Sequence, residues 1–470
     1  MMSTLLIRAD AGRTIGSGHL MRCQALAQAW EESGRSAIFV DAGDSEPGSA
    51  ADAERTIGLA REHDAAWVAI DGYHFDARYQ CRIKEAVPAL LTIDDQGNAE
   101  RYCADVVLNQ NLHADESLYR NRASNTRLLL GPHYALLRRE FRQWRQWDRP
   151  IAPKAKRVLV TLGGADPANV TMTVIDALRQ LDDIEAVIVA GAHNPHAGVL
   201  EEAVRGTNIR LERNVTSMAE LMAWADVAVS AAGSTCWELA FMGLPALVIP
   251  IAENQQPVAE RLDAAGVAIR IASGDLLQTL PKLMADEERR GAMSRRGRAL
   301  VDGEGARRVV DQLTLGLSLR PVRENDCRLL WEWTNDPAVR AASFSPDEIA
   351  WEEHAAWFRK RTSDPACLMF MAVDGETPVG QIRYEIDGET AVVSISVSPS
   401  CRGRGRGTGI IRAGSEELFA ATPVSRIDAY LKPDNAASAH AFRKAGFAGA
   451  ETTTVRGLPA LRMTLKRGAR

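Results

Sequence analysis

The sequence lacks the features that mark membrane, secreted and strongly nucleic-acid-binding proteins. Its 470 residues contain no apolar run of the ~18 residues that a membrane-spanning helix needs. Arg8 and Asp10 interrupt the first apolar stretch before a signal-peptide core could form. The formal net charge is only −5, which argues against a large basic surface for nucleic acid. We therefore expect a cytoplasmic protein with neither a membrane nor a nucleic acid as its partner.

Cysteine is also scarce, since the chain has seven, an odd number, with no CxxC pair. In a cytoplasmic protein this distribution predicts reduced thiols rather than a disulfide framework. The rest of the composition is that of a globular protein, with 46% hydrophobic and 25% charged residues. The chain exceeds the roughly 250–300 residues at which one core stops growing, so about two to four domains are expected.

The first two thirds of the chain alternate short apolar segments with helical patterns. Continuous apolar segments, typical of a parallel sheet buried on both faces, are TLLIRAD, SAIFVDA, WVAIDGY, ALLTIDD and ADVVLNQN. After a proline-containing linker at 147–156, a second series follows: RVLVTLGG, IEAVIVAG, DVAVSAAG and PALVIPI. This pattern predicts two Rossmann-like halves that face a cleft, over residues 1–150 and 151–316.

The pattern changes at residue 317. Several strand-like segments with two DGE turns precede a glycine-rich loop, a helix, one more strand and another helix. This order predicts a separate α+β domain over 317–470, within the usual size range of domains. The fold class expected for the whole chain is therefore α/β, with a pair of Rossmann-like domains followed by an α+β domain.

A histidine stands in the first glycine loop, in the segment TIGSGHLMRC. Gly16 and Gly18 allow the backbone to approach a ligand closely, and a helix that begins there directs N–H groups at an anion. The helix dipole disfavours an imidazolium, so His19 should stay neutral and be suited to act as a general base. The alternative interpretation is a helix-start histidine that is hydrogen-bonded within the core.

Two further glycine loops end strands of the second half. One contains Gly163 and Gly164, and the other, Gly233-Ser234-Thr235, offers N–H groups and hydroxyls to a diphosphate. Glu238, one helical turn further on, could accept two sugar hydroxyls, or it could merely favour the helix dipole. Three such loops at the carboxyl ends of strands, in two facing halves, predict one crevice for an anionic ligand.

Seven segments, in order over about residues 1–313, resemble the UDP-sugar hydrolases of pseudaminic acid biosynthesis: RADAGRTIGSGHLMRC, DGYHFDARY, IDDQGNA, LNQNL, LLLGPHYALLRREF, LGGADPANVT and AAGSTCWELAFMGLPALVIPIAENQQ. The resemblance implies a GT-B-like fold and the release of UDP from UDP-2,4-diacetamido-2,4,6-trideoxy-β-L-altropyranose, without a metal. It implies that His19 activates water at the anomeric carbon. The substrate-binding positions that it implies are Gly16, Gly18, Tyr73, Gly163, Gly233, Ser234, Thr235, Glu238 and Asn254.

The glycine-rich loop of the C-terminal domain lies in VSPSCRGRGRGTGII, where a strand is followed by a helix. Its glycines leave backbone N–H groups free to cradle a pyrophosphate, whereas an RGG-like nucleic-acid segment would normally be longer and disordered. Together with DAYLKPDNAASAHAFRKAGF, it resembles the GNAT N-acetyltransferases over about 318–467. The resemblance implies acetyl-CoA as cosubstrate, with binding residues Val397, Arg402, Gly403, Gly405, Gly407 and Asn435.

One position departs from the GNAT pattern. Phe442 stands where many GNAT enzymes carry a tyrosine that protonates the leaving thiolate. The start of the domain resembles the pseudaminic pathway acetyltransferase, which acts on the 4-amino group of a UDP-sugar. His354, Trp333 and Asn335 are substrate-side candidates, with packing and helix capping as alternatives at least as strong. Glu385 is a candidate general base, because its strand is expected to lie near a split in the sheet.

These observations lead to a hypothesis of a bifunctional enzyme with a UDP-amino-sugar and acetyl-CoA as its small-molecule partners. The C-terminal domain would N-acetylate a UDP-4-amino sugar, and the N-terminal domains would hydrolyse the product to UDP and the free sugar. One alternative is a GT-B glycosyltransferase fused to a GNAT domain, which an assay of UDP release without acceptor would separate. Another is a nucleotide-sugar sensor without turnover. The oligomeric state is left open.

Overall fold

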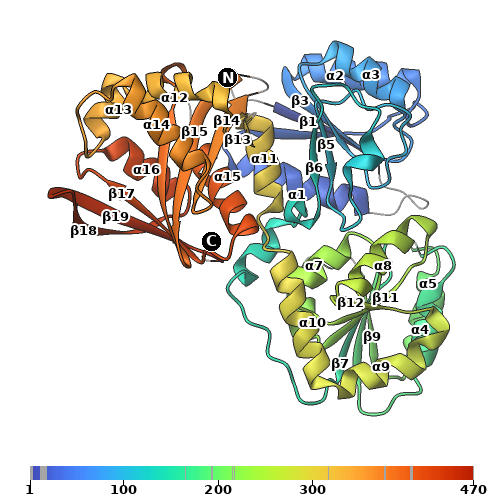
Figure 1. Ribbon diagram of the computed structural model, residues 1–470. Coiled ribbons are helices and arrows are strands. Elements are labelled where there is room, and N and C mark those ends of the chain that lie inside the picture. The colour runs from blue at the N-terminus through green and yellow to red at the C-terminus, as the bar shows by residue number, and fades with distance from the viewer. Residues whose placement is uncertain are drawn as a thin grey trace. The chain divides into compact units, whose positions relative to one another are not determined.

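The computed structural model divides the chain into two compact units, Met1–Val310 and Asp311–Arg470 (Figure 1). It describes residues 4–10, 18–164, 166–191, 194–213, 215, 217–315, 317–374, 377–402 and 406–468. The first unit contains two six-stranded sheets and the second a seven-stranded sheet. The three sheets confirm the expected fold class, in which two Rossmann-like halves precede an α+β domain.

The first sheet is parallel, with strand order β2-β1-β3-β4-β5-β6. Its strands are β1 (Thr4–Ala9), β2 (Ser36–Val40), β3 (Ala65–Asp71), β4 (Leu90–Ile93), β5 (Val106–Asn109) and β6 (Arg127–Leu130). The helices that accompany it are α1 (Gly18–Glu32), α2 (Ala50–Glu62) and α3 (Ala77–Ala86). All five apolar segments of this half contain a strand, and the short edge strand β6 was not expected from the sequence.

The second sheet is also parallel, with strand order β12-β11-β10-β7-β8-β9. Its strands are β7 (Arg157–Thr161), β8 (Glu185–Ala190), β9 (Ile209–Arg213), β10 (Val227–Ala231), β11 (Ala246–Ile249) and β12 (Ala268–Arg270). Its helices are α4 (Val170–Leu178), α5 (Ala197–Val204), α6 (Met218–Trp224), α7 (Thr235–Phe241), α8 (Gln256–Ala264), α9 (Leu276–Ala285) and α10 (Glu287–Leu300). A further helix, α11 (Gly305–Leu315), spans the boundary between the two units.

Burial explains why the strands of the second sheet are apolar throughout. Successive residues of β7 belong to different hydrophobic clusters: Leu159 packs on one face of the sheet, whereas Val158 and Val160 pack on the other. The neighbouring strand β10 alternates in the same way. A sheet covered on both faces needs an apolar side chain at nearly every position, which produces the continuous runs seen in the sequence.

Two arginines, the partly buried Arg149 and the buried Arg290, hold the linker that joins the two sheets. Arg149 donates hydrogen bonds to the backbone carbonyls of Met222, Ala225 and Met242, at the ends of helices α6 and α7. Arg290 of α10 donates to the backbone carbonyls of Ala152 and Pro153. The linker is therefore irregular in backbone conformation, as its prolines predict, and yet it is fixed to the second sheet domain.

The second unit is built on a mixed sheet with strand order β13-β14-β15-β16-β17-β19-β18. Its strands are β13 (Leu317–Pro321), β14 (Cys367–Asp374), β15 (Thr377–Asp387), β16 (Thr390–Val397), β17 (Arg426–Leu431), β18 (Ala448–Val455) and β19 (Leu458–Lys466). Its helices are α12 (Cys327–Thr334), α13 (Pro337–Ala342), α14 (Trp351–Thr362), α15 (Arg406–Ala421) and α16 (Ala436–Lys444). Neighbouring strands are antiparallel except for β16 and β17, which are parallel.

The parallel pair opens partway along its length. Thr390 to Val393 of β16 pair with Arg426 to Ala429 of β17, and the pairing stops there although β16 continues to Val397. The last four residues of β16 therefore lack a ladder partner on this side. Such a splay leaves backbone donors and acceptors available to a ligand, since unpaired backbone groups need a partner.

Two glycines let helix α15 approach the sheet closely. A Cβ on Gly380 of β15 would lie 2.6 Å from Ile410 Cδ1, and one on Gly414 would lie 2.8 Å from the Tyr384 hydroxyl. The helix that follows the glycine-rich loop is thus seated against β15, and its N-terminus is fixed relative to the splay.

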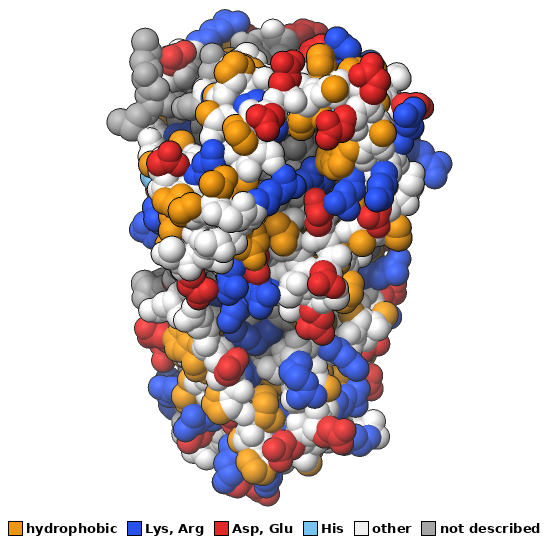
Figure 2. All heavy atoms as spheres, turned by 60° about the vertical axis from the view of Figure 1, so that its left-hand side comes forward, with side chains coloured by type: hydrophobic (Ala, Val, Ile, Leu, Met, Phe, Trp, Pro, Cys, Tyr) orange, Lys and Arg blue, Asp and Glu red, His pale blue; other side chains and the backbone are white. Residues whose placement is uncertain are grey.

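The structure corrects the expectation that all cysteines are reduced. A disulfide joins Cys81 of α3 to Cys103, whereas the other five cysteines are free. The two partners are 22 residues apart in the sequence and share no motif, so their spacing gave no signal of pairing. Over the described part of the chain, no helix is both long and apolar enough to cross a membrane. On the face in Figure 2, acidic and basic side chains are interspersed.

The disulfide predicts the number of thiols that a thiol reagent detects. Protein unfolded without reductant should yield five thiols, and the same protein should yield seven after reduction. Cys81→Ser should expose one additional thiol, because Cys103 then loses its partner. A count of seven in the unreduced wild type would show that the pair is not oxidised.

Candidate active sites

The topology brings four loops to two switch points of the first unit. In the first sheet β1 lies between β2 and β3, so the chain leaves β1 and β3 in opposite directions. In the second sheet β7 and β10 are neighbours, and the chain again leaves these two strands in opposite directions. Ligands of open α/β sheets bind where the strand order reverses, beyond the carboxyl ends of the strands. His19 follows β1, Tyr73 follows β3, Gly163 follows β7, and Gly233 follows β10.

The imidazole of His19 is held by a buried carboxylate. His19 lies in the first turn of α1 and is 7% exposed, and its Nδ1 is 2.5 Å from Oδ1 of Asp71, the last residue of β3. An ionised carboxylate only accepts hydrogen bonds, so Nδ1 carries the proton and donates it to Asp71. Nε2 is then the basic nitrogen, and no described residue forms a hydrogen bond with it. This tautomer is the one that a general base needs.

Arg22 joins Asp71 to a second carboxylate. Its guanidinium donates to both oxygens of Asp71 at 2.6 and 2.7 Å and to both oxygens of Asp95 at 2.7 and 2.8 Å. Asn111 also donates to Asp95, at 2.7 Å. Burial alone would raise the pKa of Asp71, but Arg22 and His19 outweigh it and hold that pKa well below its usual range. Asp71 is therefore ionised at neutral pH and fixes the His19 ring.

Tyr73 connects His19 with the second half of the unit. Its ring stands edge-on to the imidazole, with 5.0 Å between the ring centroids. Its hydroxyl accepts a hydrogen bond of 2.9 Å from Asn254 and lies 3.4 Å from Asp95. Tyr73 and Asn254, both expected to face the substrate, thus meet each other across the two halves of the unit.

His74, which follows Tyr73, contacts the residue that precedes the first glycine loop. Asp10, at the end of β1, lies 2.6 Å from the buried guanidinium of Arg8 and 3.1 Å from Nε2 of His74. Asp71 holds His19, which follows the loop, and His74 holds Asp10, which precedes it. Gly16 belongs to the loop and lies outside the described residues.

The loops of the two halves approach each other at Gly18. A Cβ on Gly18 would lie 3.4 Å from the hydroxyl oxygen of Ser234. Gly233 and Thr235 flank this serine and are partly exposed, and Ser234 makes no capping hydrogen bond with α7. Gly163 is exposed with a φ of +86°, a conformation that favours glycine, and the following turn is capped by Asp166. The structure thus places these positions at the ends of facing strands.

Glu238 lies in the first turn of α7, as the sequence predicts, and it has a partner. Its Oε1 accepts hydrogen bonds of 2.9 and 3.3 Å from the guanidinium of Arg138, which comes from the end of the first half. Burial raises the pKa of Glu238, whereas the charge of Arg138 opposes that shift. A binding role of Glu238 toward a ribose stays a prediction.

In the second unit, two of the predicted cofactor residues, Arg402 and Gly407, lie next to Val397 at the splay of the sheet. Arg402 donates to the backbone carbonyl of Val397, at the unpaired end of β16, and lies 2.8 Å from Asp336. A Cβ on Gly407 would meet only Val397 Cγ2, at 3.7 Å. The side chain of Asn435 caps α16 by accepting from the Ser438 N–H. Gly403 and Gly405 lie outside the described residues.

The substrate-side candidates of this unit have structural roles. His354 of α14 and Trp333 of α12 are buried, at 2% and 6% exposure. Asn335 bridges to both backbone groups of Ile349. Glu385 of β15 forms ion pairs with Arg361 and Arg383. It lies opposite Val392 of β16, which is still paired with β17, so Glu385 is not at the splay. Phe442 is buried against Phe447, so it packs the core.

Sequence reasoning missed the charged and polar residues that support His19: Arg22, Asp71, Asp95 and Asn111. The last three follow strands β3, β4 and β5, at or just beyond their carboxyl ends. Polar residues in these places, after otherwise apolar strands, were the available signal, because parallel strands bring such residues to one edge. Arg22 gave no such signal, since an arginine on a helix is usually solvated.

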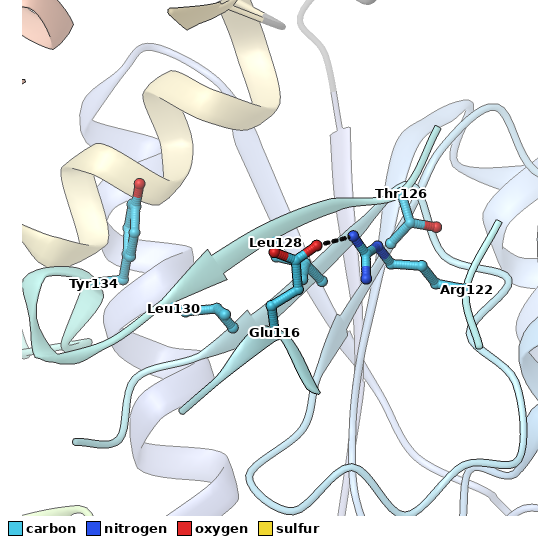
Figure 3. Close-up of a pocket in the computed structure, with 6 residues that line it drawn as sticks. All are labelled: Glu116, Arg122, Thr126, Leu128, Leu130 and Tyr134. Carbon is cyan, nitrogen blue, oxygen red and sulfur yellow. Dashed lines mark hydrogen bonds and ion pairs between the residues drawn. The ribbon is translucent and has the colours of Figure 1, made fainter. Parts of the chain in front are cut away.

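One pocket of the first unit contains none of these residues. It has a volume of about 430 Å³ at the edge strand β6 and is lined by Glu116, Arg122, Thr126, Leu128, Leu130 and Tyr134 (Figure 3). Glu116 and Arg122 pair with each other across it. Its only fixed charges therefore neutralise each other, and the pocket is separate from the His19 site in sequence and in lining.

Comparison with known families divides the chain as the sheets do. Residues 157–312 match the glycosyltransferase family 28 C-terminal domain, and residues 317–448 match the acetyltransferase (GNAT) domain. Fold and sites therefore define an enzyme with a glycosyltransferase-like part and an acetyltransferase domain. Within that class, the chain is related to a UDP-sugar hydrolase, as the segments in its first part indicate.

Three relatives match the first part of the chain, and the first of them carries the hydrolase name. The pseudaminic acid cytidylyltransferase and UDP-2,4-diacetamido-2,4,6-trideoxy-beta-L-altropyranose hydrolase of Helicobacter pylori is 25% identical over 56% of this chain and 47% of its own length. The spore coat polysaccharide biosynthesis protein SpsG of Bacillus subtilis is 28% identical over 48% of this chain and 70% of its own. An uncharacterized protein of Methanocaldococcus jannaschii is 24% identical over 63% and 62%. The chain thus spans half to two thirds of these relatives.

The buried charge network predicts a large stability effect for Arg22→Leu. Asp71 and Asp95 would lose their cation while buried, which should lower the local stability by about 3–5 kcal/mol. Hydrogen exchange over residues 65–75, followed by mass spectrometry, measures this. Since the pKa of Asp71 is lowered by folding, its contribution should be present at neutral pH and be lost as the pH falls below about 4.

Arg82→Leu is the matched control for this substitution. Arg82 pairs with Glu54 on the surface, where both side chains are more than half exposed, so its loss should cost about 1 kcal/mol or less. Equal protection from hydrogen exchange in Arg22→Leu and Arg82→Leu would show that the charge network around Asp71 does not stabilise this region.

Proposed function

We propose that this protein is a bifunctional enzyme of nucleotide-sugar metabolism. The first unit hydrolyses a UDP-2,4-diacetamido-2,4,6-trideoxy-hexose of the pseudaminic acid type to UDP and the free sugar. The second unit transfers an acetyl group from acetyl-CoA to the 4-amino group of the precursor. The observation that carries the first assignment is the His19–Asp71 pair at the switch point, next to the loops of the glycosyltransferase-like half.

The hydrolysis follows from the His19 tautomer. The free Nε2 takes a proton from water as the water oxygen bonds to the anomeric carbon, and the bond from that carbon to the UDP oxygen breaks. Asp71 stabilises the imidazolium that forms, because its carboxylate already accepts the Nδ1–H. The hydroxyls of Ser234 and Thr235 and the backbone N–H groups around Gly233 would bind the negative charge that grows on UDP. The proton on His19 then leaves to solvent.

Acetyl transfer is supported by the splay between β16 and β17. The unpaired backbone of residues 394–397 could accept the amides of an extended pantetheine, and α15 begins beside it. The substrate amine, once neutral, attacks the thioester carbon and the carbon–sulfur bond breaks. The nitrogen gives up one proton and the departing thiolate takes up one, so that an amide and the thiol of CoA result. Arg402 is oriented by Val397 and Asp336 before any ligand binds, which suits it to a pyrophosphate.

A glycosyltransferase is the second candidate function of the first unit. The match of residues 157–312 to the glycosyltransferase family 28 C-terminal domain favours it. It would use the same UDP site and differ in passing the sugar to an acceptor hydroxyl instead of water. Release of UDP and free sugar from the purified protein without acceptor supports the hydrolase, whereas dependence on an added acceptor supports the transferase.

Removal of the base should abolish most of the hydrolysis. His19→Ala should lower kcat for UDP release by at least about 100-fold, the usual scale for a general base. Asp71→Asn should lower kcat by about 10²–10⁴ with little change in KM, because the imidazole loses its fixed tautomer. Acetylation, which uses the other unit, should be unchanged in both variants.

His63→Ala is the control for these substitutions, because His63 is the C-cap of α2 and lies outside the site. It should hydrolyse the substrate at the wild-type rate. Near-normal UDP release by His19→Ala would remove His19 from the chemistry.

The glycine loop of the second unit predicts a separable effect. Gly407→Val should weaken acetyl-CoA binding at least about tenfold by calorimetry, because a bulky side chain blocks a pyrophosphate from backbone N–H groups. A Cβ at this position meets its nearest neighbour at an ordinary 3.7 Å, so folding should survive. UDP release serves as the internal control. Unchanged affinity would mean that the cofactor lies elsewhere.

A further inference from the structure

One ion pair joins the two halves of the first unit next to the predicted nucleotide site. Arg138 immediately precedes the short helix η3 (Arg139–Trp144), and it reaches Glu238 of α7, 100 residues further along the chain. The backbone of this segment is fixed, because the Arg139 N–H donates to Gln28 of α1, the helix that begins with Gly18 and His19. Arg138 is therefore held in place by the helix that carries the base.

The pairing leaves half of the carboxylate unused. Both hydrogen bonds from Arg138 go to Oε1 of Glu238, and no described residue forms a hydrogen bond with Oε2. Both side chains retain 13% exposure, so the pair is largely but not wholly excluded from solvent. A carboxylate needs partners for both oxygens when it is this deeply placed. Glu238 thus keeps one acceptor oxygen available, one helical turn beyond Ser234 and Thr235.

We propose that Arg138 is a positioning residue that holds the carboxyl group of Glu238 and aims its free oxygen at the ribose hydroxyls of UDP. The guanidinium fixes the carboxylate from one side and thereby presents Oε2 on the other. An oxygen aimed at the ribose 2′-hydroxyl would make the site discriminate between a ribonucleotide and a deoxyribonucleotide. This inference rests on the proposed UDP-sugar function and adds to it a determinant of nucleotide specificity.

The electrostatic surroundings explain why the carboxylate needs the arginine. Burial raises the pKa of Glu238, Arg138 opposes this, and the neighbouring Glu140 reinforces it. Cys236, in the same turn of α7, is buried, and its own pKa is raised to about 12, so it stays a neutral thiol. Without Arg138, Glu238 would take up a proton at a higher pH than in the wild type. A protonated carboxyl accepts hydroxyl hydrogen bonds less strongly than a carboxylate.

The test compares UDP with 2′-deoxy-UDP by calorimetry on the full chain. Arg138→Gln should weaken UDP binding at least about tenfold near neutral pH, as expected for loss of a charge-assisted hydrogen bond. Binding of 2′-deoxy-UDP should change much less, because it lacks the hydroxyl that Glu238 accepts. The deficit for UDP should grow as the pH is lowered, because burial raises the pKa of Glu238 and the variant lacks the charge of Arg138 that opposes this shift.

Two further variants complete the design. Arg138→Lys keeps the positive charge. UDP binding by this variant should therefore vary with pH much less than UDP binding by Arg138→Gln, even if the hydrogen bonds are lost. Arg142→Gln is the matched control. Arg142 lies in η3, close to Arg138 in the sequence, but it pairs with Glu32, and about half of its side chain is exposed. It should bind both nucleotides as the wild type does. Thermal unfolding of each variant verifies that the first unit is folded.

The outcomes separate this inference from the proposed function. Equal losses for UDP and 2′-deoxy-UDP in Arg138→Gln would show that Arg138 only tethers the halves, and unchanged UDP binding would show that it has no role; either result overturns the inference. A wild type that prefers UDP over 2′-deoxy-UDP through Arg138, yet releases no UDP from UDP-sugars, supports the inference and contradicts the hydrolase. A wild type that does not bind UDP contradicts both.

Discussion

The arrangement of the first unit depends on one buried carboxylate, that of Asp71. It accepts hydrogen bonds from the imidazole of His19 and the guanidinium of Arg22, and Arg22 in turn binds Asp95. An isolated buried charge would be strongly unfavourable, and only this completed set of partners makes it tolerable. The same contacts that stabilise the carboxylate also fix the ring of His19, so the stability of this region and the geometry of the site come from the same atoms.

Strand order explains why these groups meet. The loops after β1 and β3 diverge from adjacent strands, and so do the loops after β7 and β10 in the second sheet. Each half therefore brings two loops to one place, and contacts such as Tyr73 with Asn254 and Arg138 with Glu238 join the halves there. These two hydrogen bonds cross between the halves next to the predicted nucleotide site, so they contribute to holding the halves together there.

The sequence predicted the helices and strands better than it predicted which side chains contact the site residues. The apolar strands and glycine loops were predictable, because each follows from a local pattern. The positions of His19 and Glu238 followed from those loops, whereas Tyr73 was implied only by the resemblance to the UDP-sugar hydrolases. The strands β6, β9 and β12 were not predicted; all three lie at sheet edges and are only partly buried. The partners of the site residues could not be predicted, because Asp71 lies 52 residues from His19 and Arg138 lies 100 residues from Glu238, and only the folded topology joins them. The Cys81–Cys103 disulfide was missed for the same reason.

Under the proposed function, the two units would bind their phosphorylated ligands in different ways. In the first unit the groups that would act are side chains, held by a network of buried charges that must be complete before the ring of His19 is fixed. In the second unit the groups available are mainly backbone, exposed where β16 outlasts its pairing with β17, and Arg402 is oriented by a carbonyl and one carboxylate. The first site is therefore sensitive to single charge substitutions, whereas the second depends on main-chain shape and tolerates changes that leave the splay and its glycines in place.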